Sequence, residues 1–273
     1  RTHLGAETIK KKLPDITDFV RTYVKIEPIE EPIPVQPTAH YAMGGIPTDV
    51  YSRVLSDEKG TVLPGVYAAG EAACVSVHGA NRLGTNSLLD IVVFGKRAGQ
   101  SMVDYVTQTK PNSISDSASD DLSKKIQNLI DKEHTDEFSV ANIRKDLQES
   151  MEENAKIFRT KETLEKQTEI LEELRDRYEN VTIFDKSKVH NSELVEAIEL
   201  DYLLDMSEAT VASALARNES RGAHSRQDFP DRDDTNFMKH SFAFKKDNTA
   251  NLKYKDVELG LSLIHISEPT RPS

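Results

Sequence analysis

The 273-residue sequence predicts an α/β region followed by an all-α region and a small C-terminal domain. Two observations support this prediction. Residues 1–110 contain most of the twelve glycines and two short apolar runs that are typical of β-strands. Residues 121–218 contain no glycine, and their apolar residues recur at the spacing of amphipathic helices. We therefore expect one part built on strands and turns, and a second part built as a helical bundle.

The composition restricts the classes of protein to which the chain can belong. Its formal net charge of −11 argues against nucleic-acid binding, which normally needs a basic face. Cys74 is the only cysteine, so neither a disulfide framework nor a multi-cysteine metal site is expected. The sequence has no apolar run of about 18 residues that would predict a transmembrane helix, and it does not begin like a signal peptide. We expect a soluble protein whose sequence, lacking an initiator methionine, begins within a longer chain.

The elements of the first region follow one another in a simple order. Residues 27–37, EPIEEPIPVQP, predict an extended connector, because each proline biases the residue before it away from the helix. The segments SRVLSD (52–57) and VLPGVYAAGE (62–71) predict strands, and residues 86–106 predict a helix. The polar stretch PNSISDSASD (111–120) predicts a linker or exposed loop before the helical region.

The helical region is expected to contain three or four packed helices. Its periodic apolar positions are Leu122, Ile126, Leu129 and Ile130, then Val140, Ile143, Leu147 and Met151, then Leu164, Ile170, Leu171, Leu174 and Tyr178, and finally Leu194, Ile198, Leu203 and Leu204. Asn191 or Ser192 can cap the helix that begins ELVEAIELDYLL. We interpret the charged residues between the apolar stripes as a solvent-exposed face without catalytic use.

Glu71 is a candidate cofactor ligand because it follows an apolar run that ends in Gly70. A carboxylate just beyond the carboxyl end of a strand can accept hydrogen bonds from sugar hydroxyls, as it does in dinucleotide-binding sites. A surface glutamate after a turn would show the same local pattern. The residues AAGE by themselves leave both interpretations open.

The start of the helix at residue 86 is a second candidate for cofactor binding. Asn86 or Ser87 can cap this helix, and we expect its apolar residues Leu88, Leu89, Val92, Val93 and Met102 to bury it. Its first N–H groups then face whatever precedes the helix, and the helix dipole makes that end electropositive. An electron-rich ring oxygen or an anionic ring nitrogen, such as that of a reduced flavin, would be stabilised there.

Arg82 and His40 are candidate ligands for an anion. Arg82 lies among small residues in HGANRLGTNSLLD (78–90), where a charge needs a partner from the protein or from a ligand. His40 follows the proline-rich connector and precedes Gly44 and Gly45, where the backbone can approach a ligand closely. A lone histidine is more often structural, and we expect His78 only to shape the loop before Arg82. Cys74 is interpreted as a small buried filler.

Three segments together resemble the succinate dehydrogenase/fumarate reductase flavoprotein family: PTAHYAMGGIPT (37–48), GVYAAGEAACVSVHGANRLGTNSLLDIVVFGKRAG (65–99) and RNESRGAHSRQDFPDRDD (217–234). The resemblance covers residues 1 to about 258. It implies FAD as cofactor and the following parts: the end of a capping domain with its connector (1–35), the C-terminal part of a Rossmann-like FAD-binding domain (36–110), a linker (111–120), a helical domain (121–218) and the start of a C-terminal domain (219–258).

The resemblance also implies a role for each candidate residue. Glu71, Ser87 and Leu88 match the family's flavin contacts, while His40 and Arg82 match its ligands for the substrate carboxylate. Arg82 would then be paired by the dicarboxylic substrate. The family's glycine-rich fingerprint, the histidine that carries FAD covalently and the arginine that shuttles the substrate proton have no counterpart here. No catalytic residue and no metal ligand is therefore expected within this sequence.

The implied reaction is the oxidation of succinate to fumarate, with hydride transfer to FAD and electron transfer through an iron–sulfur subunit to quinone. The implied partners are that subunit and the membrane-anchor subunits of respiratory complex II. The implied location is peripheral, on the cytoplasmic face of the bacterial inner membrane or the matrix face of the mitochondrial one. Fumarate reductase and L-aspartate oxidase are alternatives within the superfamily. A non-catalytic helical interaction module, based on residues 121–218, is an alternative of another class.

The end of the sequence leads to two further expectations. In ESRGAHSRQDFPDRDD (219–234), alternating charges predict a network that holds the helical and C-terminal regions against the flavin-binding domain or a partner subunit; its expected members are Arg221, Arg226, Asp231, Arg232 and Asp233. The last residues, 259–273, include LSLIHISEPTRPS (261–273), which resembles translated sequencing-adapter or vector sequence. We interpret residues 259–273 as a non-native tail.

Overall fold

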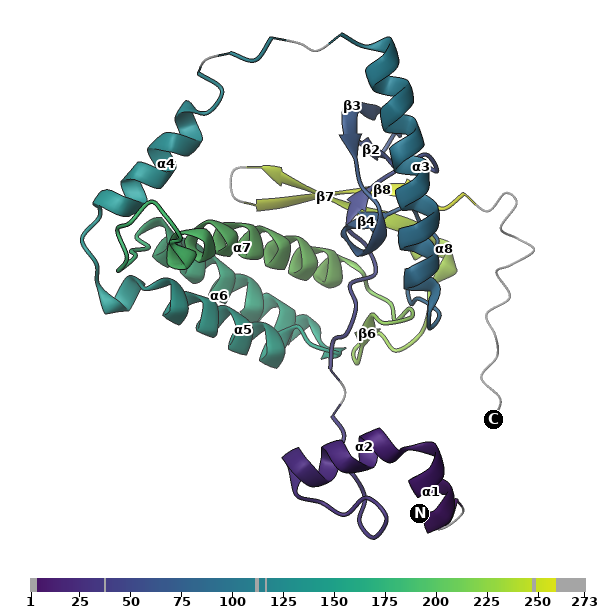
Figure 1. Cartoon of the computed structure of the whole chain (residues 1–273). Coiled ribbons are helices and arrows are strands. Elements are labelled where there is room, and N and C mark those ends of the chain that lie inside the picture. Colours follow the sequence, from purple (N-terminus) through teal and green to yellow (C-terminus); the bar gives the residue numbers. More distant parts are fainter. Residues whose placement is uncertain (1–3, 37, 111–112, 116, 247–248, 259–273) are drawn as a thin grey trace. The chain divides into compact units, whose positions relative to one another are not determined.

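The computed structural model describes residues 4–36, 38–110, 113–115, 117–246 and 249–258 (Figure 1). The predicted non-native tail, 259–273, lies outside the described residues. The chain divides into two compact units, residues 1–38 and 39–273, and each is described by itself.

The first unit consists of short helices and an irregular segment. Helix α1 (Ala6–Lys12) is followed directly by α2 (Pro14–Phe19) and by a π-helical turn, η1 (Val20–Val24). Residues 32–36 have no regular secondary structure, as the prolines of the predicted connector require.

The second unit begins with two small pairs of strands. Strand β1 (Ile46–Pro47) pairs in parallel with β4 (Ala73–Cys74), and β2 (Arg53–Leu55) pairs in antiparallel orientation with β3 (Val62–Tyr67). Both predicted strand segments are thus confirmed at their cores. The end of the second segment forms a 3-10 turn instead, η2 (Gly70–Ala72), which contains Glu71.

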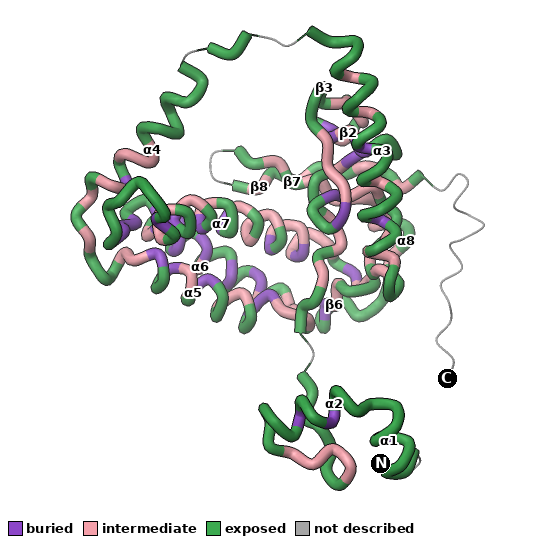
Figure 2. Tube along the Cα trace, viewed as in Figure 1, coloured by how far each residue is buried: buried purple, intermediate pink, exposed green. Residues whose placement is uncertain are grey.

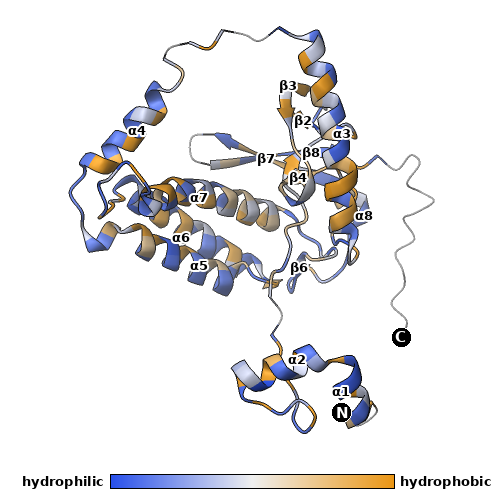
Figure 3. Ribbon diagram, in the orientation of Figure 1, coloured by the Kyte–Doolittle hydropathy of each residue, from blue (hydrophilic) through white to orange (hydrophobic). Residues whose placement is uncertain are grey.

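The predicted helix is confirmed as α3 (Asn86–Gln108), but its cap and its burial differ from the expectation. The N-cap is Thr85, which has φ of 69° and makes no capping hydrogen bond through its side chain, so neither Asn86 nor Ser87 caps the helix. The apolar residues expected to bury α3 are exposed: Leu88, Leu89, Val92, Val93 and Met102. Figure 2 shows most of α3 as exposed, and Figure 3 shows hydrophobic residues along it. The physical reason is that α3 packs mainly against the small elements η2 and β3, and the residues of α3 that are buried are Asp90 and Ala98.

The hydrophobic core lies in the helical bundle. Helices α5 (Val140–Asn154), α6 (Lys161–Glu179) and α7 (Ser192–Ala216) pack against one another, while α4 (Asp120–Asp131) contributes Leu129. Figure 2 shows buried residues along the inner faces of α5, α6 and α7. The other core residues include Val140, Ile143, Leu147, Leu164, Leu171, Leu174, Ala197, Leu200 and Leu204. Asn191 caps α7 by accepting a hydrogen bond from the Leu194 N–H, at 2.8 Å. The predicted bundle of three or four helices is confirmed.

The interpretation of the charged residues in the bundle as solvent-exposed is wrong for Arg175. This residue of α6 is 7 % exposed, and its guanidinium lies 2.7 Å from Asp201, 2.6 Å from Asp205 and 2.8 Å from Glu208. The three carboxylates lie on successive turns of one face of α7. Burial alone would lower the pKa of Arg175, but the hydrogen bonds and charges of Glu208 and Asp205 raise it. Three carboxylates thus offset the cost of burying one cation.

The C-terminal part adds short elements and a hairpin. A 3-10 turn, η3 (Asp136–Phe138), precedes α5, and β5 (Phe158–Arg159) pairs in parallel with β6 (Ser225–Arg226). Helix α8 (Asp234–Phe237) leads into the antiparallel pair of β7 (Lys239–Lys246) and β8 (Thr249–Asp256). In the part of the chain that the structure describes, we find no helix that is both long and apolar enough to cross a membrane.

Candidate functional site

Arg82 lies in the loop between β4 and α3 and has no acidic partner. Its guanidinium carbon is 4.3 Å from the centroid of the Tyr41 ring. The Arg82 Nε atom is buried and makes no hydrogen bond, and no carboxylate in the described ranges forms an ion pair with this side chain. A guanidinium that is partly removed from water normally has a charged partner. The site therefore fits an anionic ligand.

The segment around His40 connects Arg82 with Glu71. Tyr41, which lies under Arg82, directly follows His40, and the next residue, Ala42, donates its N–H to Glu71 Oε1 at 3.4 Å. Burial, followed by the charges of Asp90 and Glu71, raises the pKa of Tyr41, while the charge of Arg82 opposes this shift. The His40 side chain itself is exposed. The structure thus brings the segment that carries His40 next to both Arg82 and Glu71.

Gly45 is needed where this segment passes the turn of Glu71. A Cβ atom at Gly45, which has φ of 124°, would lie 2.5 Å from the carbonyl oxygen of Ala72. From the sequence, we expect Gly44 and Gly45 to allow a close approach of the backbone to a ligand. At Gly45 the structure shows a close approach to the protein's own backbone, which keeps residues 40–45 against η2.

The N-terminus of α3 carries the other two predicted cofactor ligands, Ser87 and Leu88. The Leu88 N–H donates to the carbonyl of Thr85 at 3.0 Å, and the Asn86 N–H donates to that of Leu83 at 3.2 Å. The Ser87 N–H has no hydrogen-bond partner among the described residues. Since α3 packs against η2, this free donor and the carboxylate of Glu71 belong to adjacent elements.

His78 and Asp90 form a pair that the sequence analysis did not identify. His78 Nε2 lies 3.0 Å from Asp90 Oδ2, and the two side chains are 11 % and 3 % exposed. The His78 ring also contacts the Tyr41 ring edge-on, at 5.8 Å between centroids and 87° between planes. The signal in the sequence was Asp90 itself, a single charge within the apolar run LLDIVV.

The C-terminal part contacts the loop of Arg82 directly. The Ala223 N–H donates to the carbonyl of Ala80 at 3.0 Å, and Ser76 Oγ lies 2.9 Å from His240 Nε2 of β7. A Cβ atom at Gly222, which has φ of 58°, would lie only 2.4 Å from the Ala80 carbonyl oxygen. Gly222 therefore allows the segment 219–226 to support the loop that carries Arg82.

We expect Gly222→Ala to destabilise the protein by more than backbone strain alone. The left-handed conformation costs an alanine about 1 kcal/mol, and the overlap with Ala80 adds about 1–3 kcal/mol. Gly79→Ala is the matched control, because Gly79 has the same φ of 58° but open space around its Cβ position. The measurement is the urea midpoint of both variants. Equal shifts would contradict a tight contact at Gly222.

The segment 219–234 forms a charged network, but its centre is Glu219 rather than a predicted member. Glu219 is fully buried and accepts hydrogen bonds from Arg217 at 2.7 Å, from Arg221 at 2.9 Å and from the Asp233 N–H at 2.9 Å. Burial alone would raise the pKa of Glu219, but these hydrogen bonds lower it. The network thus fixes this segment from within.

The predicted members have different roles in this network. Arg221 also contacts Asp234, at 2.6 Å, and Arg232 contacts the same carboxylate at 2.9 Å. Arg226 is fully buried, pairs with Asp228 at 2.8 Å and donates to the Ala214 carbonyl at the end of α7. Asp233 caps α8, and Asp231 accepts a hydrogen bond from the Ser220 N–H through its carbonyl.

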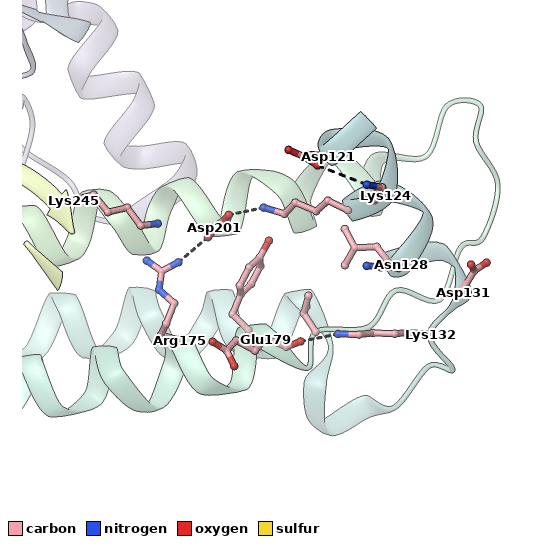
Figure 4. Close-up of a pocket in the computed structure, with 13 residues that line it drawn as sticks. Asp121, Lys124, Asn128, Asp131, Lys132, Arg175, Glu179, Asp201 and Lys245 are labelled. Carbon is pink, nitrogen blue, oxygen red and sulfur yellow. Dashed lines mark hydrogen bonds and ion pairs between the residues drawn. The ribbon is translucent and has the colours of Figure 1, made fainter. Parts of the chain in front are cut away.

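An open pocket of about 790 Å³ lies in the helical bundle and contains none of the predicted site residues (Figure 4). Lys125 and Arg175 both contact Asp201 there, Lys124 contacts Asp121, and Lys132 donates to the carbonyl of Glu179. These cations are thus paired within the protein. We interpret the pocket as part of the ionic packing between α4, α6 and α7.

Comparisons with known proteins are consistent across the chain. The family described as FAD binding domain matches residues 1–88, and the family described as fumarate reductase flavoprotein C-term matches residues 144–271. The chain is 44 % identical over 263 residues to the succinate dehydrogenase flavoprotein subunit of Rickettsia bellii, covering 94 % of this chain and 44 % of that protein. It is 41 % identical to the fumarate reductase flavoprotein subunit of a Serratia strain, and this match covers 94 % of this chain and 42 % of that protein.

The comparison with solved structures indicates the same family. The solved structure of Escherichia coli quinol fumarate reductase FrdA matches with a TM-score of 0.83 and 40 % identity, over 93 % of this chain and 43 % of that one. The chain therefore spans less than half the length of these relatives. The match confirms the predicted fold class, an α/β FAD-binding part followed by a helical bundle and a small C-terminal domain, and it confirms FAD as the cofactor. This chain belongs to the succinate dehydrogenase/fumarate reductase flavoprotein family.

Proposed function

We propose that the protein containing this chain oxidises succinate to fumarate, and that this chain supplies the dicarboxylate-binding side of its active site. The observation that carries the proposal is the Arg82 guanidinium, which has no carboxylate partner in the described ranges and whose carbon lies 4.3 Å from the centroid of the Tyr41 ring. A planar guanidinium can hold a carboxylate through two parallel hydrogen bonds. We propose His40 as the second hydrogen-bond donor to the same carboxylate, because it directly precedes Tyr41, which contacts Arg82.

The residues at η2 and α3 fit FAD through their chemistry. The exposed Glu71 carboxylate accepts a long hydrogen bond from Ala42, so it remains available for a ribityl or ribose hydroxyl. Thr85 provides no side-chain cap and Ser87 keeps a free N–H, so the positive end of α3 can meet the electron-rich edge of the flavin. The Leu88 N–H already donates to the Thr85 carbonyl, so it would contribute less to binding the flavin.

The protein's residues would position the substrate for a reaction that FAD completes. When bound, FAD supplies the acceptor for a hydride from one methylene of succinate. Arg82 and His40 would hold the substrate carboxylate and thereby place that methylene over the ring. The group that removes the proton from the other methylene is proposed to come from outside this sequence, as the resemblance implies.

The partners and location follow from the same proposal. The electrons would leave through an iron–sulfur subunit to quinone, with membrane-anchor subunits completing the complex. The E. coli relative is a quinol fumarate reductase, which supports a quinone-linked partner reaction. The protein would then lie peripherally on the cytoplasmic face of a bacterial inner membrane or on the matrix face of a mitochondrial one.

Fumarate reduction is the second candidate, because the identity to a fumarate reductase is nearly as high as that to a succinate dehydrogenase. The test is to measure both directions on the FAD-loaded complex, with dye reduction by succinate and with quinol-dependent reduction of fumarate. We expect succinate oxidation to be the faster reaction at neutral pH. A faster fumarate reduction would assign the second function, and inactivity toward both dicarboxylates would overturn the dicarboxylate site.

A further inference from the structure

The contact between Arg82 and Tyr41 is the start of a chain of side chains that leads back to α3. The Arg82 guanidinium lies 4.3 Å from the Tyr41 ring centroid, the Tyr41 ring meets the edge of His78 at 5.8 Å, and His78 lies 3.0 Å from Asp90. Asp90 belongs to the first turns of α3, one turn after Ser87. The two residues of each contact are at least 12 positions apart in the sequence.

The inner end of this chain is rigid because it is buried. The side chains of His78 and Asp90 are 11 % and 3 % exposed, and His78 Nε2 lies 3.0 Å from Asp90 Oδ2, within hydrogen-bond distance. A hydrogen bond between two buried side chains restricts the orientation of the imidazole. The T-shaped contact then restricts the Tyr41 ring, since aromatic pairs prefer this geometry.

The outer end of the chain holds a cation without using its hydrogen-bond donors. A guanidinium over the face of an aromatic ring is attracted by the ring quadrupole, and this contact uses none of its N–H groups as hydrogen-bond donors to a carboxylate. This matches Arg82, which makes no hydrogen bond within the described residues. A carboxylate partner from the protein would have oriented Arg82 equally well, but it would have occupied the same donors.

We propose that Tyr41 is a positioning residue for the dicarboxylate site, holding the Arg82 guanidinium on its ring while the His78–Asp90 pair keeps that ring in place. The inference rests on the proposed function of Arg82 as the substrate-carboxylate ligand. It adds that the affinity for the dicarboxylate depends on the aromatic face at residue 41, and that this dependence acts through Arg82.

The test is a double-mutant cycle on the FAD-loaded protein, with malonate as the probe and the flavin spectrum as the readout. Tyr41→Leu should weaken malonate binding by about five- to thirtyfold, the range of a partly desolvated cation–π contact. Tyr41→Phe keeps the aromatic face and should restore most of the affinity. When Arg82 is already replaced by lysine, Tyr41→Leu should weaken binding by less than about twofold, because the stacked guanidinium is gone.

Each outcome decides between distinct conclusions. Equal losses from Tyr41→Leu in both backgrounds would show a merely structural residue and overturn the inference. Weak malonate binding in Arg82→Lys, together with unchanged binding in Tyr41→Leu, would overturn the inference and leave the proposed function intact. Unchanged binding in Arg82→Lys would overturn both. If Tyr41→Leu retains no flavin, Tyr41→Met takes its place in the same cycle as a second side chain without a ring.

Discussion

Arg82→Lys is expected to lower succinate turnover by about a hundredfold while the protein keeps its FAD. A lysine ammonium retains the charge but cannot reproduce the two parallel hydrogen bonds of a guanidinium. The carboxylate would therefore be held less precisely, and a displacement of about 1 Å at the reacting carbon can cost roughly a hundredfold in rate. The flavin should remain because Arg82 lies outside η2 and the first turn of α3, where the proposed cofactor contacts are.

The measurements are succinate-dependent dye reduction and the flavin content of the purified complex. His40→Ala should show a milder defect, roughly tenfold, because one of the two donors remains. Arg97→Lys is the matched control: Arg97 is an exposed arginine of α3 that donates to the Val50 carbonyl at 2.9 Å. Turnover close to normal in Arg82→Lys, or flavin loss as its main effect, would identify Arg82 as a structural residue.

Glu219→Ala is expected to lower the free energy of unfolding by about 3–5 kcal/mol. The carboxylate is fully buried and accepts hydrogen bonds from Arg217, from Arg221 and from the Asp233 N–H. Its removal would leave two largely buried guanidinium groups without their main partner, and that loss is the reason for the large effect. The measurement is urea unfolding at neutral pH. An exposed glutamate of α6 serves as control, and Glu172→Ala should change the free energy of unfolding by less than about 0.5 kcal/mol.

The lowered pKa of Glu219 provides a second readout of the same network. A carboxyl group whose pKa is lower in the folded state stabilises the fold fully above its unfolded pKa. This contribution is lost as the pH falls from about 4.3, the ordinary glutamate value, through the lower pKa of the folded state. Glu219→Gln cannot titrate, so its stability should fall less steeply in this acid range. Parallel acid curves for the two proteins would contradict an ionised, paired Glu219.

Local features of the sequence were sufficient for the longest helices and for one pair of strands. Apolar spacing and glycine placement predicted β2, β3, α3 and the bundle, because secondary structure depends mainly on periodicity and on nearby turn residues. The same local reasoning was wrong about the cap and the burial of α3. An apolar stripe indicates that a face can be buried, but it does not indicate which element covers it.

The candidate site could be predicted in part. Arg82 and Glu71 were identifiable because a charge in an unusual local context stands out in one segment of sequence. The partners that orient them were not identifiable: Tyr41 lies 41 residues before Arg82. The burial of Arg175 was missed for a related reason, since its three carboxylates come from another helix.

The sequence by itself determined the strands β2 and β3, the helix α3 and the helical bundle, that Arg82 lies in a loop of small residues and needs a partner, and which family the chain resembles. Only the tertiary structure decided that Tyr41 lies under Arg82, that His78 pairs with Asp90, that Glu219 is buried among arginines, and that Gly222 meets Ala80. The physical reason is that hydrogen bonds, ring contacts and ion pairs act over a few ångströms in space. Their partners are therefore chosen by the path of the folded chain and not by their separation along it.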